Sequence, residues 1–184
     1  MSENQTIKEL LEKAKQRDIE AAKEILRHIS DKMYFITRLF VADHEQARKV
    51  EQAGLKKVFS SLKEVTNPEW FECWAAEKVR KEAIAHVLPL EESKTNSNMY
   101  TEADEIPNYM AVLPETAEGK KYQVLEMMDK LSTGARAALA LHLYDGLSVE
   151  ESAKLLMSTP QSVMSWLTEA KDTLMSNGFN LGTL

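Results

Sequence analysis

The sequence has little of what would mark a secreted or membrane protein. It holds one cysteine, Cys73, which excludes an internal disulfide framework and fits a reducing cytosol. No run approaches the roughly 20 apolar residues that a membrane span needs. The polar N-terminus lacks the apolar core of a signal peptide. We therefore expect a cytoplasmic location.

Motifs for metal, cofactor and catalytic chemistry are also missing. The sequence has no phosphate loop and no G-x-G-x-x-G. Its four histidines are dispersed, without H-E-x-x-H or a Cys/His ligand spacing: His28, His44, His86 and His142. We expect no metal, no cofactor and no enzyme, and an enzyme built from scattered groups is kept only as a third hypothesis.

Glycine (6) and proline (5) are scarce, so long helices are expected. No strand pattern of period two occurs, and the fold class is predicted as all-α. Four helices are expected in residues 1–88. The first starts at the Thr6-x-x-Glu9 capping box, the third follows Asp43 from about Glu45 to Lys63, and the fourth runs from Pro68 to His86, where Pro89 ends it. The second is a long helix after Asp18 with an apolar stripe: Ile19, Ala22, Leu26, Ile29, Met33, Ile36 and Phe40.

The excess negative charge lies in one segment. Residues 1–88 hold 16 basic and 15 acidic residues, residues 89–119 hold one and seven, and residues 120–184 hold six and seven. The middle segment has no sustained period and many small polar residues. We predict two small helical bundles, at 1–88 and 120–184, joined by an acidic linker at 89–119.

The last part of the sequence contains two short helices joined by about three residues. After helices at about Lys120–Lys130 and from Ser132, with Gly146 as the expected C′ glycine, Ser148 and Glu151 form a second capping box. Thr159-Pro160 then combines an N-cap with proline at the first helical position. This spacing is typical of a helix-turn-helix, whose second helix can enter the major groove, and also of an ordinary αα-hairpin.

This layout resembles the extracytoplasmic-function sigma factors of bacterial RNA polymerase. The motifs that carry the resemblance are Leu131-Ser132-x-x-x-Arg136, Leu139-x-Leu141, Gly146-Leu147-Ser148-x-Glu150-Glu151-Ser152-Ala153, Val163 and Ala170, and more faintly Arg17-Asp18-x-x-Ala21, Ala47 with Gln52, and Phe71-x-x-Trp74. The resemblance implies that the N-terminal domain binds core RNA polymerase and opens the promoter −10 element. The C-terminal domain would bind the −35 element, and an anti-sigma factor is a further expected partner.

Two sets of candidate residues follow. The DNA-binding set has a C-terminal group: Arg136, Thr159, Gln161, Ser162, Ser165, Thr168 and Lys171. It also has an N-terminal group, in which aromatic residues beside cations suit unpaired bases: Trp70, Trp74, Lys78 and Lys81. The polymerase-binding set is Arg48, Lys49, Gln52 and Lys56. The alternatives are that both tryptophans are core residues, that the lysines and arginine form solvated faces, and that Arg136 pairs with Glu150 or Glu151.

The sequence also departs from the family pattern. Met164, Trp166 and Glu169 stand at usually basic positions of the last helix, Met157 replaces the turn glycine, and Lys49 replaces an acid. Phosphate binding depends on Lys and Arg. A second hypothesis is therefore a divergent sigma-like module that binds polymerase or a regulator without binding DNA.

Overall fold

The computed structural model describes residues 3–88 and 118–178, and within these ranges every regular element is helical. The prediction of an all-α fold is confirmed. The chain divides into two compact units, Met1–His86 and Val87–Leu184, which are described separately below. Among the described helices, none is long and apolar enough to cross a membrane.

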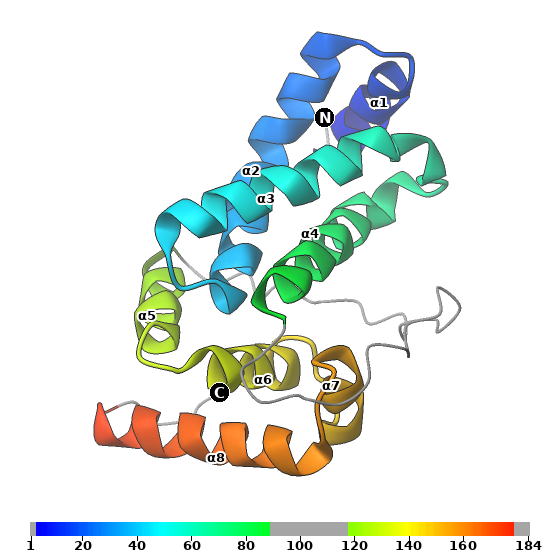
Figure 1. Cartoon of the computed structure of the whole chain (residues 1–184). Coiled ribbons are helices and arrows are strands. Elements are labelled where there is room, and N and C mark those ends of the chain that lie inside the picture. Colours follow the sequence, from blue (N-terminus) through cyan, green and yellow to red (C-terminus); the bar gives the residue numbers. More distant parts are fainter. Residues whose placement is uncertain (1–2, 89–117, 179–184) are drawn as a thin grey trace. The chain divides into compact units, whose positions relative to one another are not determined.

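The N-terminal unit consists of four α-helices and two short 3-10 turns (Figure 1). Its elements are α1 (Glu3–Lys15), α2 (Ile19–Phe40), α3 (His44–Ser60), η1 (Leu62–Glu64), η2 (Pro68–Trp70) and α4 (Phe71–Val87). Two predicted caps are confirmed, because Asp18 accepts from the amide of Ala21 at 3.1 Å and Asp43 accepts from that of Gln46 at 2.8 Å. These caps start α2 and α3 where the sequence indicated.

Four details of the prediction are wrong. Helix α1 begins at Glu3, so Thr6 lies inside it and does not cap it. Helix α3 ends at Ser60, and the next turn is the separate η1. The helix expected from Pro68 starts as the 3-10 turn η2. Finally, Ile19 and Leu26 are 69% and 38% exposed, because the buried face at the start of α2 runs through Ala21 and Ile25 instead. The later part of the predicted stripe is buried as expected: Ile29, Met33, Ile36 and Phe40. The expected stop at Pro89 lies outside the described residues.

Helices α3 and α4 approach each other closely at a glycine. A Cβ added to Gly54 would lie 2.9 Å from the Cα of Val79, which is closer than real Cβ contacts allow. Gly54 therefore has a packing role inside a helix where glycine would otherwise only cost stability. Phe71, Ala75, Val79 and Ala83 of α4 are fully buried.

The C-terminal unit is built around one buried helix. Its elements are α5 (Glu118–Met128), α6 (Thr133–Leu143), α7 (Val149–Leu155) and α8 (Pro160–Ser176). Every residue of α6 from Gly134 to Leu141 is buried, and α8 packs across it while α7 packs on α8 (Figure 1). At the crossing the indole of Trp166 covers Gly134, where an added Cβ would lie 2.5 Å from Cε2 of the ring. A glycine in α6 thus makes room for a tryptophan of α8.

Candidate nucleic-acid interface

The residues that start α7 and α8 make the hydrogen bonds that the sequence predicted. Ser148 and Glu151 form a complete capping box, with the Glu151 amide 3.2 Å from the Ser148 hydroxyl and the Ser148 amide 2.8 Å from the Glu151 carboxylate. The hydrogen bonds with Ser148 lower the pKa of the Glu151 carboxyl. The amide of Ser162 donates to the Thr159 hydroxyl at 3.1 Å, which starts α8.

The turn between the two helices keeps the geometry that a glycine would favour. Met157 has φ 49°, in the left-handed region. Its amide donates to the carbonyl of Lys154 at 3.2 Å, and the amide of Ser158 donates to that of Ala153 at 2.9 Å. These two bonds form the pattern that closes a helix before a sharp reversal. The pair α7–α8 is therefore a helix-turn-helix with methionine at its strained position.

The exposed face of α8 carries little charge. It presents Gln161, Met164, Ser165, Thr168, Glu169, Lys171, Asp172 and Met175, whereas Val163, Ala170 and Leu174 are buried. Its charged groups are one lysine and two acids. Three of the predicted hydroxyl contacts already have partners, because the Thr159 and Ser162 hydroxyls lie 3.0 Å apart and Thr168 donates to the carbonyl of Met164 at 2.9 Å. Gln161, Ser165 and Lys171 are the exposed candidates that remain.

Arg136 does not lie on this face. Its side chain is 1% exposed, and its guanidinium donates to Asp129 at 2.8 Å. A buried guanidinium cannot reach a phosphate without unfolding the core around it, so the predicted contact with DNA is wrong. The alternative of a structural ion pair holds, with Asp129 as the partner. The apolar residues around Arg136 gave no signal of this, because Asp129 lies in the preceding turn outside the motif.

In the N-terminal unit the structure separates the two tryptophans. Trp70, at the end of η2, is 52% exposed. Trp74 is half-buried, with its ring centroid 6.2 Å from that of Phe71, and the Lys78 ammonium lies 4.6 Å above its ring. Lys78 also pairs with Glu64 at 3.1 Å, and Lys81 pairs with Glu77 at 2.8 Å. Trp70 therefore has the accessibility that base stacking requires, and Trp74 is partly a core residue.

The four candidates for polymerase contact share the exposed side of α3, although two of them also have local partners. The guanidinium of Arg48 stacks 3.6 Å from the Tyr34 ring centroid and pairs with Glu51 at 3.0 Å. Lys49 pairs with Glu45 at 2.7 Å. Gln52 and Lys56 are exposed. Burial raises the pKa of Glu51, against the opposing effect of Arg48. The Arg48–Tyr34 stack joins α3 to α2 and was not predicted.

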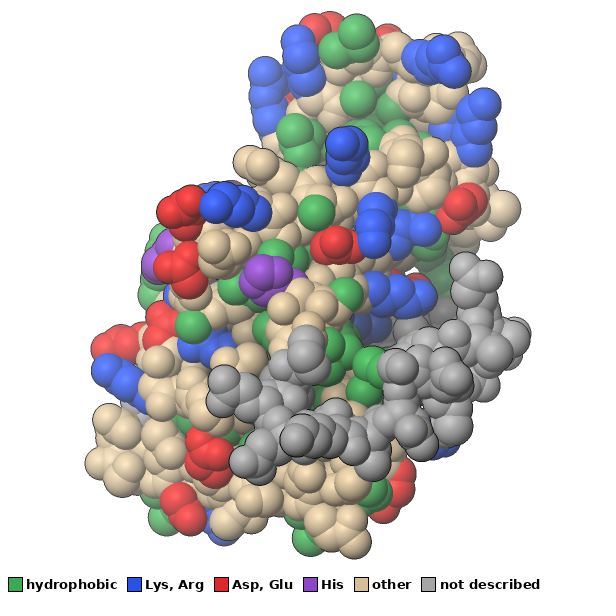
Figure 2. All heavy atoms as spheres, in the orientation of Figure 1, with side chains coloured by type: hydrophobic (Ala, Val, Ile, Leu, Met, Phe, Trp, Pro, Cys, Tyr) green, Lys and Arg blue, Asp and Glu red, His purple; other side chains and the backbone are tan. Residues whose placement is uncertain are grey.

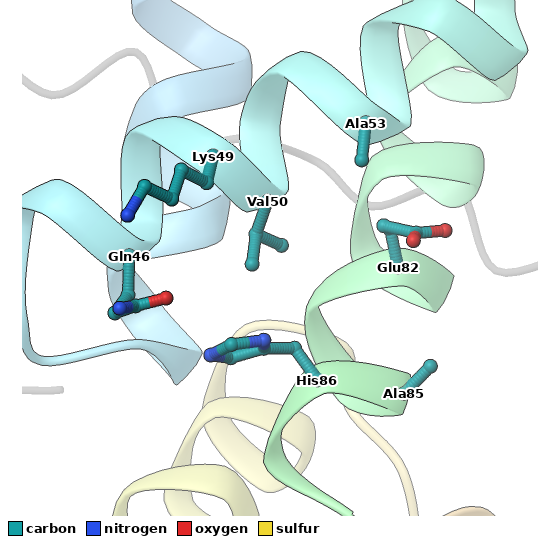
Figure 3. Close-up of a pocket in the computed structure, with 7 residues that line it drawn as sticks. All are labelled: Gln46, Lys49, Val50, Ala53, Glu82, Ala85 and His86. Carbon is teal, nitrogen blue, oxygen red and sulfur yellow. The ribbon is translucent and has the colours of Figure 1, made fainter.

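A groove that the sequence did not indicate lies beside these residues. Away from the Gly54 crossing, α3 and α4 enclose an open cavity of about 300 Å³, into which the His86 ring points (Figure 3). Its lining combines apolar and polar side chains: Gln46, Lys49, Val50, Ala53, Glu82, Ala85 and His86. Glu82 is also paired with Lys57. On the face drawn in Figure 2, Lys and Arg side chains lie mostly over the N-terminal unit.

The geometry of α6, α7 and α8 defines the C-terminal unit as a helix-turn-helix domain. Residues 121–174 match the family model of sigma-70 region 4. The predicted resemblance to sigma factors is confirmed there. A solved structure, CnrH in complex with the cytosolic domain of CnrY, resembles the chain with 16% sequence identity and a TM-score of 0.40, over 93% of this chain and 96% of that chain. No curated protein matches the chain.

The described residues include no group of three or more His, Cys, Asp or Glu side chains that could hold a metal ion.

Proposed function

We propose that this protein is a sigma-like transcription initiation factor that binds core RNA polymerase and promoter DNA. The observation that carries the proposal is the match of residues 121–174 to sigma-70 region 4, together with the α7–α8 geometry that presents α8 outward. In this role α8 enters the major groove of the −35 element. Gln161, Ser165 and Lys171 are its contact residues, with Thr159, Ser162 and Thr168 at the edge of the contact.

The small charge of α8 sets the strength of this contact. A protein gains DNA affinity by releasing counterions, roughly one for each neutralised phosphate. One lysine and two acids on the exposed face provide little of this gain. We therefore expect the C-terminal unit to contribute orientation and some sequence preference, while most of the affinity comes from the polymerase.

The N-terminal unit is proposed to hold the polymerase and the unpaired −10 strand. Exposed Trp70 is the proposed stacking residue, and Trp74, Lys78 and Lys81 follow it along α4. The exposed side of α3, with Arg48, Lys49, Gln52 and Lys56, is the proposed polymerase surface. The groove lined by Gln46, Val50 and His86 adjoins this surface and offers an apolar recess to it.

The remaining assignments follow the same role. We propose an N-terminal domain at 1–88, an acidic linker at 89–119 and a DNA-binding domain at 120–184. The factor works in the cytoplasm and has no catalytic chemistry of its own. An anti-sigma factor remains a predicted partner.

A second function is favoured by one observation, the exposed face of α8 with two methionines and an excess of acid. Exposed methionines suit adaptable protein contacts. In this alternative the protein binds polymerase or a regulator and makes no duplex contact.

Charge substitutions on α8 distinguish the two functions. The purified protein would first be tested for capture of core polymerase, and the complex would then be titrated with promoter duplex over a salt series. Under the proposed function, Gln161→Glu with Lys171→Glu weakens duplex binding, and Asp172→Lys strengthens it and steepens the salt dependence by about one unit. Polymerase capture should not change in either variant, since all three substituted residues lie outside the N-terminal unit. The second function would be selected if the protein captures polymerase but the complex does not bind the duplex, and if Asp172→Lys does not produce duplex binding.

A further inference from the structure

The described methionines divide sharply by exposure. Met33, Met127 and Met128 are 0%, 5% and 0% exposed, so their sulfur atoms are packed in the cores of the two units. The exposed ones are in the helix-turn-helix: Met157 at 39%, and Met164 and Met175 each at 59%. Among the described methionines, the thioethers that a small oxidant can reach thus lie on α8 and on the turn before it.

Two of these residues share one side of α8. Met164 and Met175 are eleven positions apart, which is about three turns of an α-helix, so both side chains emerge in nearly the same direction. Thr168 and Lys171 lie between them on that side, at helical spacings of four and three residues. A change at either sulfur therefore alters the face that carries Lys171, the cation of the proposed DNA contact.

We propose that Met164 and Met175 are sites of oxidation by hydroperoxides and that their conversion to sulfoxides weakens the binding of duplex DNA by α8. The second part rests on the proposed function. The first part rests only on exposure and the chemistry of the thioether.

The reaction needs no cofactor. The sulfur lone pair attacks one oxygen of the peroxide, the O–O bond breaks and the S–O bond forms. Sulfur loses two electrons, and the peroxide is reduced to water or, for an organic peroxide, to the alcohol. The product is a polar sulfoxide that reductases return to the thioether, one enzyme for each epimer.

The sulfoxide would act against DNA binding in two ways. It places a hydrogen-bond acceptor where phosphates and base edges approach, and it removes an apolar surface that could contact a thymine methyl group. The face has one lysine and two acids, so no surplus of positive charge offsets this change. Because both side chains project away from the core, the fold of the unit should persist.

The first experiment maps the oxidation sites. The full chain carrying Cys73→Ser, which removes the half-buried thiol as a competing target, would be treated with dilute hydrogen peroxide and sampled over time by peptide mass spectrometry. We expect Met164 and Met175 to oxidise at least about tenfold faster than Met33, Met127 and Met128, with unchanged far-UV circular dichroism. Equal rates at buried and exposed methionines in the folded protein would overturn the assignment.

The second experiment measures the effect on binding. Promoter-duplex binding by the polymerase complex would be compared for the reduced factor, the oxidised factor and the oxidised Met164→Leu/Met175→Leu variant. We expect oxidation to lower affinity about threefold to tenfold, the variant to resist this loss, and treatment with both sulfoxide reductases to restore binding.

The outcomes separate the two proposals. If Met164 and Met175 oxidise selectively but duplex affinity is unchanged, the proposed effect of oxidation on DNA binding is overturned and the proposed function as an initiation factor stands. If the reduced protein captures polymerase but does not bind the duplex, both the DNA-binding function and the effect of oxidation on it are overturned. The peptide mass spectrometry would still decide whether Met164 and Met175 are the reactive sites.

Discussion

Both units bury an arginine, but they differ in how they hold it and in the charge of their surfaces. In the N-terminal unit Arg38 is 1% exposed and donates to the backbone carbonyl of Val41 at 2.8 Å. Part-buried ion pairs also join different helices of this unit, as between Glu72 of α4 and Lys32 of α2 at 2.6 Å. In the C-terminal unit Arg136 is buried in the core, while the outer face of α8 carries hydroxyls and methionines. Exposed pairs contribute little to stability, whereas a buried charge that loses its partner costs several kcal/mol. The pairing of Arg136 with Asp129 should therefore matter more for stability than the ion pairs at the surface of either unit.

Removing Arg136 should have the largest effect. We expect Arg136→Ala to lower the free energy of unfolding of the C-terminal unit by about 3 kcal/mol, because it empties a buried volume and removes the partner of Asp129. Hydrogen exchange followed by mass spectrometry would measure this on α6, separately from the N-terminal unit. Asp129→Asn is the matched control and should cost less, since Asp129 is 39% exposed.

Normal α6 protection in Arg136→Ala, together with a flatter salt dependence of DNA binding, would restore a phosphate-contacting role for Arg136 and erase the contrast between the units.

The two close glycine contacts should differ in cost. An alanine at position 54 would meet the backbone of Val79 at 2.9 Å, whereas one at position 134 would meet the ring of Trp166, which can rotate away. We expect Gly54→Ala to destabilise the N-terminal unit by about 2 kcal/mol after the gain in helix propensity. Gly134→Ala should cost less and should shift the fluorescence of Trp166, best recorded in a Trp70→Phe/Trp74→Phe background.

A stable Gly54→Ala variant with unchanged exchange in α3 and α4 would mean that the helices separate easily, contrary to the close crossing at Gly54.

Both units contain the same backbone strain, and relieving it should have a smaller effect. Arg17 after α1 and Met157 after α7 have φ of 70° and 49°. In each case the residue's amide donates to the carbonyl three residues earlier, and the next amide donates to the carbonyl five residues earlier. We expect Arg17→Gly and Met157→Gly each to stabilise their own unit by about 0.5–1 kcal/mol. Chemical denaturation with hydrogen exchange would assign each gain.

Alanine at the same positions is the control. It removes the long side chain but keeps the Cβ, so it should give no gain. A gain with alanine equal to that with glycine would show that the side chain, and not the left-handed backbone, carries the cost.

These two positions also show what the sequence could predict. The caps at Asp18, Asp43, Ser148 and Thr159 were predictable, because one side chain bonds to an amide two or three residues away. The left-handed turn at Met157 was indicated only by the family's glycine. The burial of Arg136 and the stack of Arg48 on Tyr34 depend on residues brought together by tertiary packing, which helical periodicity does not specify. The groove depends on how α3 and α4 diverge from Gly54, and no local pattern encodes that divergence.

The smallest effect concerns pH and the ion pairs of the N-terminal unit. Burial alone would raise the pKa of Glu72, but hydrogen bonds and charges from Lys32 and His28 outweigh it, and the net pKa is lowered. His28 Nε2 lies 2.9 Å from one carboxylate oxygen, and Lys32 Nζ lies 2.6 Å from the other.

A carboxyl whose pKa is lower in the folded state stabilises the fold above its unfolded pKa, and this stabilisation is lost as the pH falls through the folded pKa. The N-terminal unit should therefore lose stability below about pH 4.5, and Glu72→Gln should flatten that loss. Denaturation at pH 7 and at successively lower pH would measure it, with α6 exchange in the same sample as the internal reference. An equal acid response in the wild type and in Glu72→Gln would show that the α2–α4 ion pairs contribute nothing measurable, and that the acid response of the first unit arises from other groups.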